Sequence, residues 1–503
     1  MPTSLSHMLA PWIAAAALVF SSTSLACDKP AKAGPVDLTT ATLEDLSAAL
    51  GAKRVTSVAL VGAYQQRIGN CDGKLHAIIS LNPSALEDAK RLDAERAAGK
   101  LRGPLHGVPI VIKDNIDMAG TVTTAGSLAL VNNLRERNAP LVDRLVAAGV
   151  VVIAKANLSE WANIRSNWSS SGWSAVGGLA VNPRDPRRTA CGSSSGSGTS
   201  VAARLAPAAI GTETNGSVTC PSSVNGLVGL KPTVGLISGE GIVPISHTQD
   251  TAGPMTATVA DNALLLAALA DPKRPVEDYR AALAPDALKG TRLGVARFIK
   301  GFSPQTESAF NAALEILKAQ GAELVEIPEF DFQDIGAHEL TLLLTELKVD
   351  LNAYLATAPA AVKTRTLADV IAFNRGEPRE TIYFGQDLFE QAEASGGLDD
   401  PKYVNALQRA RLIAGKEGLD KLLADNRVVA LVSPTYGPAW SIDLVNGDPS
   451  IASSTMLSAV IGYPHLTVPM GDVSGLPVGL SFMGPAWSEK TLLRIGYAFE
   501  QAR

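Results

Sequence analysis

The sequence predicts an α/β fold in which helices surround a central β-sheet. Short apolar runs typical of buried strands occur at residues 107–113, 150–154, 293–296 and 428–432, and helical patterns lie between them. Strands that alternate with helices favour a sheet covered by helices. The sequence has no Pro/Gly/Ser-rich linker long enough to separate independent domains, so the strands are expected to belong to one unit.

The composition supports a large buried core. Of the 503 residues, 46% are hydrophobic and 18% are charged, which excludes an intrinsically disordered chain. The formal net charge of −5 argues against a nucleic-acid-binding surface, which is usually strongly basic. No run of 18 apolar residues occurs, so a multi-span membrane protein is excluded.

The helices can be located from their end signals. The segment from Thr39 to Ala98 has mostly helical patterns. Thr42 and Ser84 each precede acidic residues, as expected for an N-cap followed by an acidic first turn, and a third helix is predicted over residues 58–68.

Two more helical regions follow. A helix over residues 141–148 is expected to end at Gly149, because glycine commonly terminates helices. Residues 270–425 are more charged and helical, apart from the strand at 293–296, and could form an inserted helical layer or cap.

The N-terminus has the pattern of a signal peptide. Residues 9–20 are apolar, and Ser24 and Ala26 are small residues that suit a signal-peptidase site before Cys27. We expect removal of residues 1–26 and export to the periplasm or medium; a short buried helix is the alternative, and a lipid anchor at Cys27 is a variant of the export interpretation. Export would place three further cysteines in an oxidising compartment where disulfides persist: Cys71, Cys191 and Cys220.

Nothing local in the sequence indicates a metal site. No two cysteines form a CxxC pair, the six histidines are far apart, and the pair His338-Glu339 lacks the second histidine of an HExxH motif. A site assembled from distant residues stays open, but we expect no metal and no cofactor.

Lys113 is the first residue that could carry chemistry. It ends the apolar run 108–112, and a charged lysine is costly to bury. Burial lowers the pKa of an amine, and a neutral amine can act as a base. Pairing with Asp114 or another carboxylate is an equally good interpretation of this residue alone.

The second stretch is the Gly/Ser-rich run 191–198, which leads into a helical segment at 199–206. A turn that feeds a helix presents backbone N–H groups and hydroxyls together. Residues 192–196 also match a G-x-S-x-G elbow, which would make Ser194 a nucleophile with His247 or His465 as its base. That elbow needs a preceding strand, and the Pro- and Arg-rich residues before it predict none.

The third stretch, residues 211–217, follows a largely apolar segment. Gly216 permits a tight turn in which successive amides point at one spot and form an anion-binding nest. A serine at the tip of such a nest, Ser217, has the geometry for attack on a carbonyl. An ordinary turn with a capping serine is the commoner interpretation of this stretch alone.

Together these three stretches resemble the amidase signature family. Its pattern is a lysine after a G-V-P-apolar strand, a G-S-S-[GS]-G-S loop and a G-x-[DE]-T-x-G-S turn, and all three occur here in that order. The resemblance covers about residues 40–500, and the loop and turn are most similar to those of bacterial peptide amidases. Further matching blocks lie at residues 225–233, 249–255, 462–464 and 475–480.

The resemblance implies one large domain over residues 37–502, with a central mixed β-sheet surrounded by helices. It also implies that Ser217 is the nucleophile, that Ser193 bridges it to the base Lys113, and that Gly192-Ser193 is a cis peptide bond. An oxyanion hole is expected from four backbone amides: Thr214, Asn215, Gly216 and Ser217.

The implied activity is hydrolysis of linear carboxamides rather than peptide bonds, with release of ammonia from peptide C-terminal amides by a monomeric enzyme that needs no cofactor. A general small-amide amidase and a glutaminase-type subunit of an amidotransferase are the alternatives within enzymes. An amide-binding protein without activity is a third, and retention of all three site residues counts against it.

Two questions stay open at this point. Cys191 and Cys220 flank the two serines closely, so they could form a disulfide or remain two buried thiols. Four aromatic residues in loop-like segments could line a substrate pocket or simply pack: Trp161, Trp173, Tyr436 and Trp440.

Overall fold

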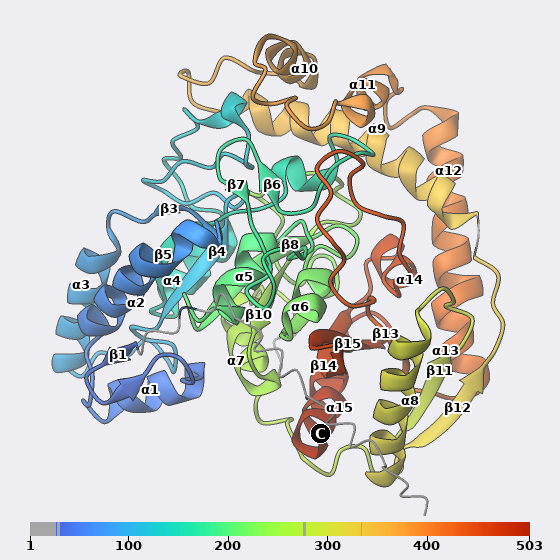
Figure 1. Cartoon of the computed structure of the whole chain (residues 1–503), viewed down its shortest axis with the longest axis horizontal. Helices are drawn as coiled ribbons and strands as arrows, with labels where there is room; N and C mark the ends of the chain where they lie inside the picture. Colours follow the sequence, from blue (N-terminus) through green and yellow to red (C-terminus); the bar gives the residue numbers. More distant parts are fainter. Residues whose placement is uncertain (1–26, 28–30, 275–277, 333) are drawn as a thin grey trace, which may run out of the picture.

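A single eleven-stranded sheet organises the protein (Figure 1). The computed structural model describes residue 27 and residues 31–274, 278–332 and 334–503. The predicted signal peptide, residues 1–26, lies outside the described residues. The predicted α/β fold, with one large domain built on a mixed sheet, is confirmed.

The sheet places strands from the two halves of the chain side by side. Its central strands β4 and β8 are buried along their whole length, which explains why their sequences are continuously apolar or small. Strand β4 is parallel to β5 and β8, strand β11 is parallel to β12 and β13, and all other neighbours are antiparallel. In order across the sheet the strands are β12 (Glu323–Ile327), β11 (Arg292–Ala296), β13 (Ala430–Pro434), β15 (Leu476–Met483), β14 (His465–Val473), β9 (Val228–Lys231), β10 (Thr251–Thr256), β8 (Ala208–Glu213), β4 (Pro109–Lys113), β5 (Val151–Ala156) and β3 (Ile78–Leu81).

All four strand predictions are confirmed, as β4, β5, β11 and β13. Two small antiparallel ribbons lie outside the main sheet. They are β1 (Lys32–Ala33) with β2 (Val36–Asp37), and β6 (Trp173–Ser174) with β7 (Gly178–Leu179).

Helices fill the intervals between the strands. The α-helices are α1 (Leu43–Gly51), α2 (Ser57–Cys71), α3 (Ala85–Ala97), α4 (Pro140–Ala147), α5 (Ser195–Ala202), α6 (Thr219–Asn225), α7 (Val259–Leu269), α8 (Pro304–Ala319), α9 (Ile335–Ala356), α10 (Leu367–Gly376), α11 (Asp387–Ala394), α12 (Pro401–Arg411), α13 (Asp420–Asn426), α14 (Met456–Val460) and α15 (Glu489–Ala502). Short 3₁₀ turns are η1 (Asp72–Lys74), η2 (Leu128–Leu130) and η3 (Glu160–Asn163), and the π-helical segment η4 (Leu412–Leu419) joins α12 to α13.

Both predicted N-cap residues, Thr42 and Ser84, begin their helices with acidic residues in the first turn, but only Thr42 makes a capping bond. Thr42 and Asp45 form a reciprocal capping box at the start of α1, and Gly149 takes a left-handed φ of +83° just after α4. The hydroxyl of Ser84, in contrast, makes no capping bond at α3. Its backbone N–H instead donates to the side chain of Asn82 at 3.0 Å, so the asparagine fixes the turn that the serine was expected to cap.

Helices α6 and α15 cover opposite faces of the sheet, as strand β14 shows. Gly496 of α15 brings that helix close to the side chains of Leu466 and Val468. Thr467 between them points the other way, toward Gly479 of β15, and the backbone N–H of Gly479 donates to the hydroxyl of Ser223 in α6 at 2.9 Å. The sheet is therefore buried on both faces.

The predicted helical layer is present between residues 335 and 426, although part of the predicted interval belongs to the sheet. Helices α9 to α12 lie along one edge of the molecule (Figure 1), and two apolar clusters distinct from the main core hold this region. Strand β11, helix α8 and strand β12, which also fall in the interval, join the main fold. Among the described residues, no helix is both long and apolar enough to cross a membrane.

Both possible disulfides of the four cysteines are closed. Cys27 is bonded to Cys71 at the end of α2, and Cys191 is bonded to Cys220 in α6. The second bond answers the question that the sequence left open between a disulfide and two thiols.

We predict that Phe482→Ala lowers the free energy of unfolding by about 3–5 kcal/mol, because it removes a large buried ring. Phe482 is fully buried in β15, and its ring centroid lies 6.1 Å from that of Phe499 in α15. Chemical denaturation measures the change. Ile382→Ala, at a position 62% exposed, is the control and should change stability by less than about 0.5 kcal/mol; equal effects of the two variants would contradict the assigned packing.

Candidate active site

Lys113 occupies the end of the central strand β4 and is fully buried. Its Nζ lies 2.8 Å from the Ser193 hydroxyl, 2.9 Å from the Thr212 hydroxyl and 3.2 Å from the Thr212 carbonyl oxygen. Burial lowers the pKa of Lys113 to about 7, against the opposing influence of the Asp250 and Glu213 carboxylates. The amine is therefore poised to be neutral near neutral pH.

Asp114 does not neutralise Lys113. Its carboxylate forms a buried ion pair with Lys155 at 3.0 Å and accepts hydrogen bonds from the backbone and hydroxyl of Thr124. Adjacent residues at a strand end point in opposite directions, which explains the separation of the two charges. Of the two interpretations of Lys113, burial without a paired Asp114 is the one observed.

Ser193 lies in the turn that leads into α5, and Gly192-Ser193 is a cis peptide bond. The serine is fully buried, and its carbonyl oxygen accepts a hydrogen bond from the backbone N–H of Ser159 at 3.0 Å. A Cβ at position 192 would lie 2.1 Å from the Ser159 hydroxyl, so only glycine fits there. The Gly/Ser run is thus a tightly packed turn rather than a flexible linker.

Ser217 lies in the turn between β8 and α6. Gly216 has a left-handed φ of +81°, and a Cβ there would lie 2.4 Å from the Tyr436 hydroxyl. The Glu213 carboxylate accepts hydrogen bonds from the N–H groups of Val218 and Thr219, at 2.8 and 2.9 Å, and so fixes the start of α6.

Two bonds tie the serine-bearing turns together. The backbone N–H of Ser194 donates to the Ser217 carbonyl oxygen at 3.1 Å, and the Cys191–Cys220 disulfide joins the same two segments. Ser217 is 9% exposed, whereas Ser193 and Lys113 are fully buried. Of the three predicted residues, only the outermost serine reaches solvent.

Ser217 opens into a cavity of about 390 Å³. Thr214 and Asn215 line it as well, and in the described part of the chain the backbone N–H groups of Asn215, Gly216 and Ser217 donate to no protein acceptor. Backbone N–H groups that lie in one turn and have no acceptor are suited to bind an oxyanion. Apolar and aromatic side chains form much of the remaining wall: Ile164, Ile245, Leu343, Tyr436, Trp440 and Ile451.

Of the four aromatic residues that could line a pocket, two lie at the Ser217 cavity. Tyr436 and Trp440 line the Ser217 cavity. Trp161 packs edge-on against Phe389, with ring centroids 5.7 Å apart, and Trp173 packs against Phe384 at 5.1 Å. Trp173 therefore serves packing, whereas Trp161 also lines a small cavity that shares Ala162, Ile164 and Ile245 with the Ser217 cavity.

The histidine-based alternative lacks its contacts. The hydroxyl of Ser194 bonds to the backbone of Thr212, donating to its oxygen at 3.1 Å. His465 is fully buried between Ser458 and Ser481, and His247 lies beside Asp350 at 2.9 Å. Neither histidine is a hydrogen-bond partner of Ser194, and residues 183–190 form no strand before it.

Sequence reasoning missed two residues of the site, Thr212 and Glu213. Thr212 holds the Lys113 amine from both its hydroxyl and its carbonyl, and Glu213 holds the start of α6. Both belong to the third motif, so their positions were visible. The partner of Thr212 was not, because it depends on the pairing of β8 with β4, whereas Glu213 bonds Val218 and Thr219, five and six residues further along.

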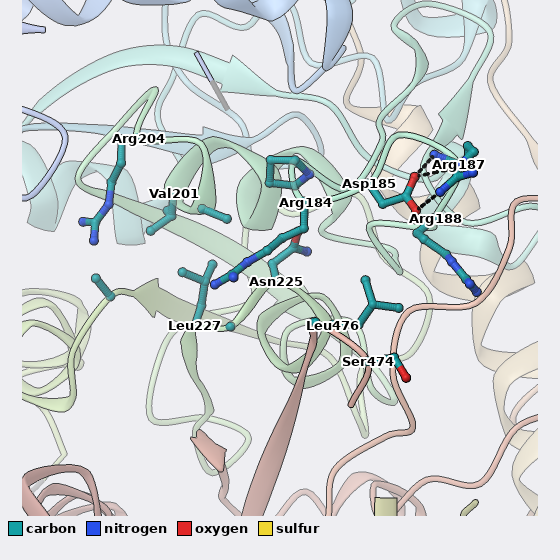
Figure 2. A pocket seen from close by; sticks show the side chains of 15 residues that line it. Arg184, Asp185, Arg187, Arg188, Val201, Arg204, Asn225, Leu227, Ser474 and Leu476 are labelled. Atoms are coloured by element: carbon teal, nitrogen blue, oxygen red, sulfur yellow. Dashed lines mark hydrogen bonds and ion pairs between the residues drawn. The ribbon is translucent and has the colours of Figure 1, made fainter. Parts of the chain in front are cut away.

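Two other features lie apart from the serines. A cavity of about 610 Å³ at the C-terminal ends of α5 and α6 is lined by four arginines, of which Arg187 is paired with Asp185 (Figure 2). Within the described ranges, the one group of side chains spaced to hold a metal ion does not line the Ser217 cavity. That group is His247, Glu346 and Asp350.

Comparison with known proteins agrees with this geometry. The amidase family model matches residues 59–493. The solved structure of a peptide amidase from Stenotrophomonas maltophilia is 47% identical in sequence, with a TM-score of 0.87, over 92% of this chain and 96% of that one.

Two curated relatives extend the comparison. A "probable amidase" of Arabidopsis thaliana is 39% identical over 92% of this chain and 90% of its own length. The A subunit of the glutamyl-tRNA(Gln) amidotransferase of Chloroflexus aggregans is 35% identical over 90% of this chain and 94% of its own length. The matches span nearly the whole described chain, and the chain belongs to the amidase signature family.

Proposed function

We propose that this amidase hydrolyses C-terminal carboxamides of peptides through Ser217, Ser193 and Lys113, by way of an acyl-enzyme. The observation that carries the proposal is the 2.8 Å contact between the buried Lys113 amine and Ser193, next to a turn that presents Ser217 to a cavity. Such a chain of a neutral base, a bridging hydroxyl and an exposed hydroxyl is an activated nucleophile.

The contacts of Lys113 suit a neutral amine. A neutral Nζ has two hydrogens and one lone pair, and three oxygen atoms lie around it. The two hydrogens satisfy the hydroxyl and the carbonyl of Thr212, which leaves the lone pair to accept the hydrogen of the Ser193 hydroxyl. Ser193 can then accept the proton of Ser217 as it passes its own to Lys113.

The reaction follows from this proton path. Ser217 Oγ attacks the amide carbon, and its proton moves through Ser193 to Lys113. The oxyanion is bound by the amides of the turn 214–217, and collapse of the intermediate returns the proton to the leaving nitrogen, releasing ammonia. Water then attacks the acyl ester, delivers its proton along the same path, and frees the carboxylic acid and Ser217.

The lining of the cavity favours a peptide amide over free glutamine. Glutamine carries an α-carboxylate close to its amide, and no lysine or arginine is among the described residues that line the cavity. Asp448 is the one charged side chain of this lining, so the α-carboxylate of glutamine finds no cation there, although its α-ammonium could face Asp448. The apolar and aromatic walls suit an uncharged peptide chain, and the 47% identity with a peptide amidase supports the same choice.

We predict that the protein releases ammonia from N-protected dipeptide amides with a higher kcat/KM than from free glutamine or short aliphatic amides. Ser217→Ala should abolish this activity, with a loss on the order of 10⁴–10⁶ in kcat, because no second nucleophile is proposed. A coupled ammonia assay across the three substrate classes measures both effects.

Hydroxylamine should trap the acyl-enzyme of the wild type as a hydroxamate. Glutamine as the best substrate would favour the amidotransferase-type alternative. Retained activity of Ser217→Ala would overturn the assignment of the nucleophile.

We predict that kcat/KM rises with pH along a single limb with its midpoint near 7. Burial lowers the pKa of Lys113 to about 7, so below this pH the amine carries a proton and cannot accept one from Ser193. The active form is the deprotonated one, and the rate therefore falls on acidification. Rate measurements against pH at low substrate concentration give the midpoint.

Lys113→Arg is the matched variant for this limb. It keeps a cation that cannot lose its proton, and kcat should fall by about 10²–10⁴-fold. An arginine variant with near-normal activity and an unchanged pH limb would exclude Lys113 as the base.

We also propose that the mature protein is exported. The signal-like residues 1–26 and two disulfides within one chain both support an oxidising compartment. A lipid on Cys27 would use the sulfur that is bonded to Cys71, so the two modifications exclude each other.

We predict that expression of the full sequence in a bacterium with a periplasm yields a mature chain that begins at Cys27, with both disulfides closed. Osmotic-shock fractionation, N-terminal sequencing and intact mass measurement check this. A cytoplasmic chain that retains its N-terminus would contradict export. An acylated Cys27 would keep export and contradict the Cys27–Cys71 bond.

A further inference from the structure

The side chain of Asn215, in the turn that carries Ser217, is held at both ends. Its Nδ2 donates to the Glu339 carboxylate at 2.8 Å, and its Oδ1 accepts from the Thr455 hydroxyl at 2.6 Å. These two partners come from α9 and from the segment just before α14. The backbone N–H of the same asparagine is one of the unpaired amides that face the cavity.

The same oxygen of Glu339 serves a second contact at the turn. Glu339 Oε1 accepts from the Gln249 side chain at 2.9 Å, and that amide also lies 3.5 Å from the Thr214 carbonyl oxygen. The Thr214 hydroxyl donates to Asp250 at 2.6 Å. The two residues that precede Gly216 are therefore both clamped by side chains from outside the turn.

The carboxylate of Glu339 is buried beside the turn 214–217 without a paired cation among the described residues. Glu339 is 6% exposed, and no lysine, arginine or histidine of the described residues forms an ion pair with it. Burial raises its pKa, while the hydrogen bonds from Gln249 and Asn215 act in the opposite direction. Burying a carboxyl group without a cation is costly, and an apolar residue would fill the position at less cost.

We infer that Glu339 is a positioning residue that, through Asn215, aims the backbone amides of residues 215–217 at the oxyanion. The inference rests on the proposed function, since an oxyanion forms beside this turn only if Ser217 is the nucleophile. The direction of a backbone N–H follows ψ of the preceding residue and φ of its own, and the Asn215 side chain is anchored by Glu339 and Thr455 at its two ends. Without the Glu339 anchor the turn can rotate, and the donors lose alignment with an oxygen that exists only in the transition state.

The effect should therefore appear in kcat and not in KM. Removal of one oxyanion donor, or a displacement near 1 Å, typically costs about 10²–10³-fold in rate. Glu339→Ala is expected to lower kcat by about 10²-fold and to change KM by less than about threefold. The affinity for a peptide aldehyde, which forms a tetrahedral adduct, should fall in parallel with kcat/KM.

Two further variants distinguish a loss of alignment of the turn from a loss of the Glu339 charge and from a loss of stability. The amide oxygen of Glu339→Gln can still accept from Asn215 and Gln249, so this variant should retain kcat within about fivefold. Thr455→Val releases the other end of Asn215 and should lower kcat with little change in KM, as Glu339→Ala does. Because Thr455→Val acts on the same side chain, it tests the inference even where Glu339→Ala folds poorly.

Glu346→Gln is the matched control. Glu346 lies two turns further along α9, is fully buried, and accepts from Tyr403 at 2.8 Å and from the Thr248 hydroxyl at 3.0 Å, but it does not contact the turn 214–217. Its variant should lower the melting temperature and leave kcat within about threefold of the wild type. Wild-type kcat in both Glu339→Ala and Thr455→Val, or an equal loss of kcat in Glu346→Gln, would overturn the inference.

Failure of the proposed function has a different signature. If Ser217→Ala remains active, the nucleophile is wrong whatever Glu339 does. If Ser217→Ala is inactive while the Glu339 and Thr455 variants keep their kcat, only the positioning role is wrong.

Discussion

The burial of one amine, that of Lys113, is the constraint on which the site depends. A lysine is kept deprotonated near neutral pH by desolvation, and this requires a position deep in the sheet with no carboxylate in contact. The central strand β4 supplies the depth, and the carboxylate of the adjacent residue, Asp114, is paired with Lys155 instead. Thr212 supplies uncharged oxygens that can satisfy the hydrogens of a neutral amine.

The same constraint explains why both serines lie where helices begin. Ser193 and Ser217 each lie just before a helix, α5 and α6, and the turns around them must approach each other and Lys113 closely. Small residues make this possible: a Cβ on Gly196 would lie 2.3 Å from the Ala77 carbonyl oxygen. The Gly/Ser composition therefore reflects close packing of backbone against backbone.

The sequence predicts the parts of this protein that depend on local patterns. Four of the eleven sheet strands, the helix ends at Thr42, Ser84 and Gly149, the cis bond and the three ordered stretches follow from periodicity, capping signals and the family resemblance. The failures share one physical cause, which is competition between partners that the pattern around a residue does not specify. Ser84 begins α3 as predicted but makes no capping bond, since Asn82 bonds that turn, and Trp173, a candidate pocket residue, packs against Phe384.

Long-range contacts of the helical layer are the clearest case. Asn215 and Glu339 are 124 positions apart, and no local pattern states which loop a helix will cover. Glu339 stands beside His338, a pair that suggests a metal motif and lacks its second histidine. Its place at the turn is decided by how α9 packs over the sheet edge, which is a property of the whole fold.

Helix α9 shows how such a layer reaches the candidate active site. Its polar residues Glu339, Glu346 and Tyr354 recur at helical spacing on one face, a pattern that in sequence is typical of a solvent-exposed stripe. All three are buried instead. They bind, respectively, the turn after β8, the loop before β10 through Thr248, and the segment after β4 through Asp117.

One helix thus spans three loops at one edge of the sheet. The sheet determines where the Lys113 amine is buried. The positions of the loops around that amine are not determined by the sheet alone. Of the three buried polar residues of α9, Glu339 bonds to the turn that carries Ser217, whereas Glu346 and Tyr354 hold neighbouring loops. In the proposed mechanism the site is therefore defined jointly: the sheet holds Lys113, and Glu339 of α9 holds the turn of Ser217.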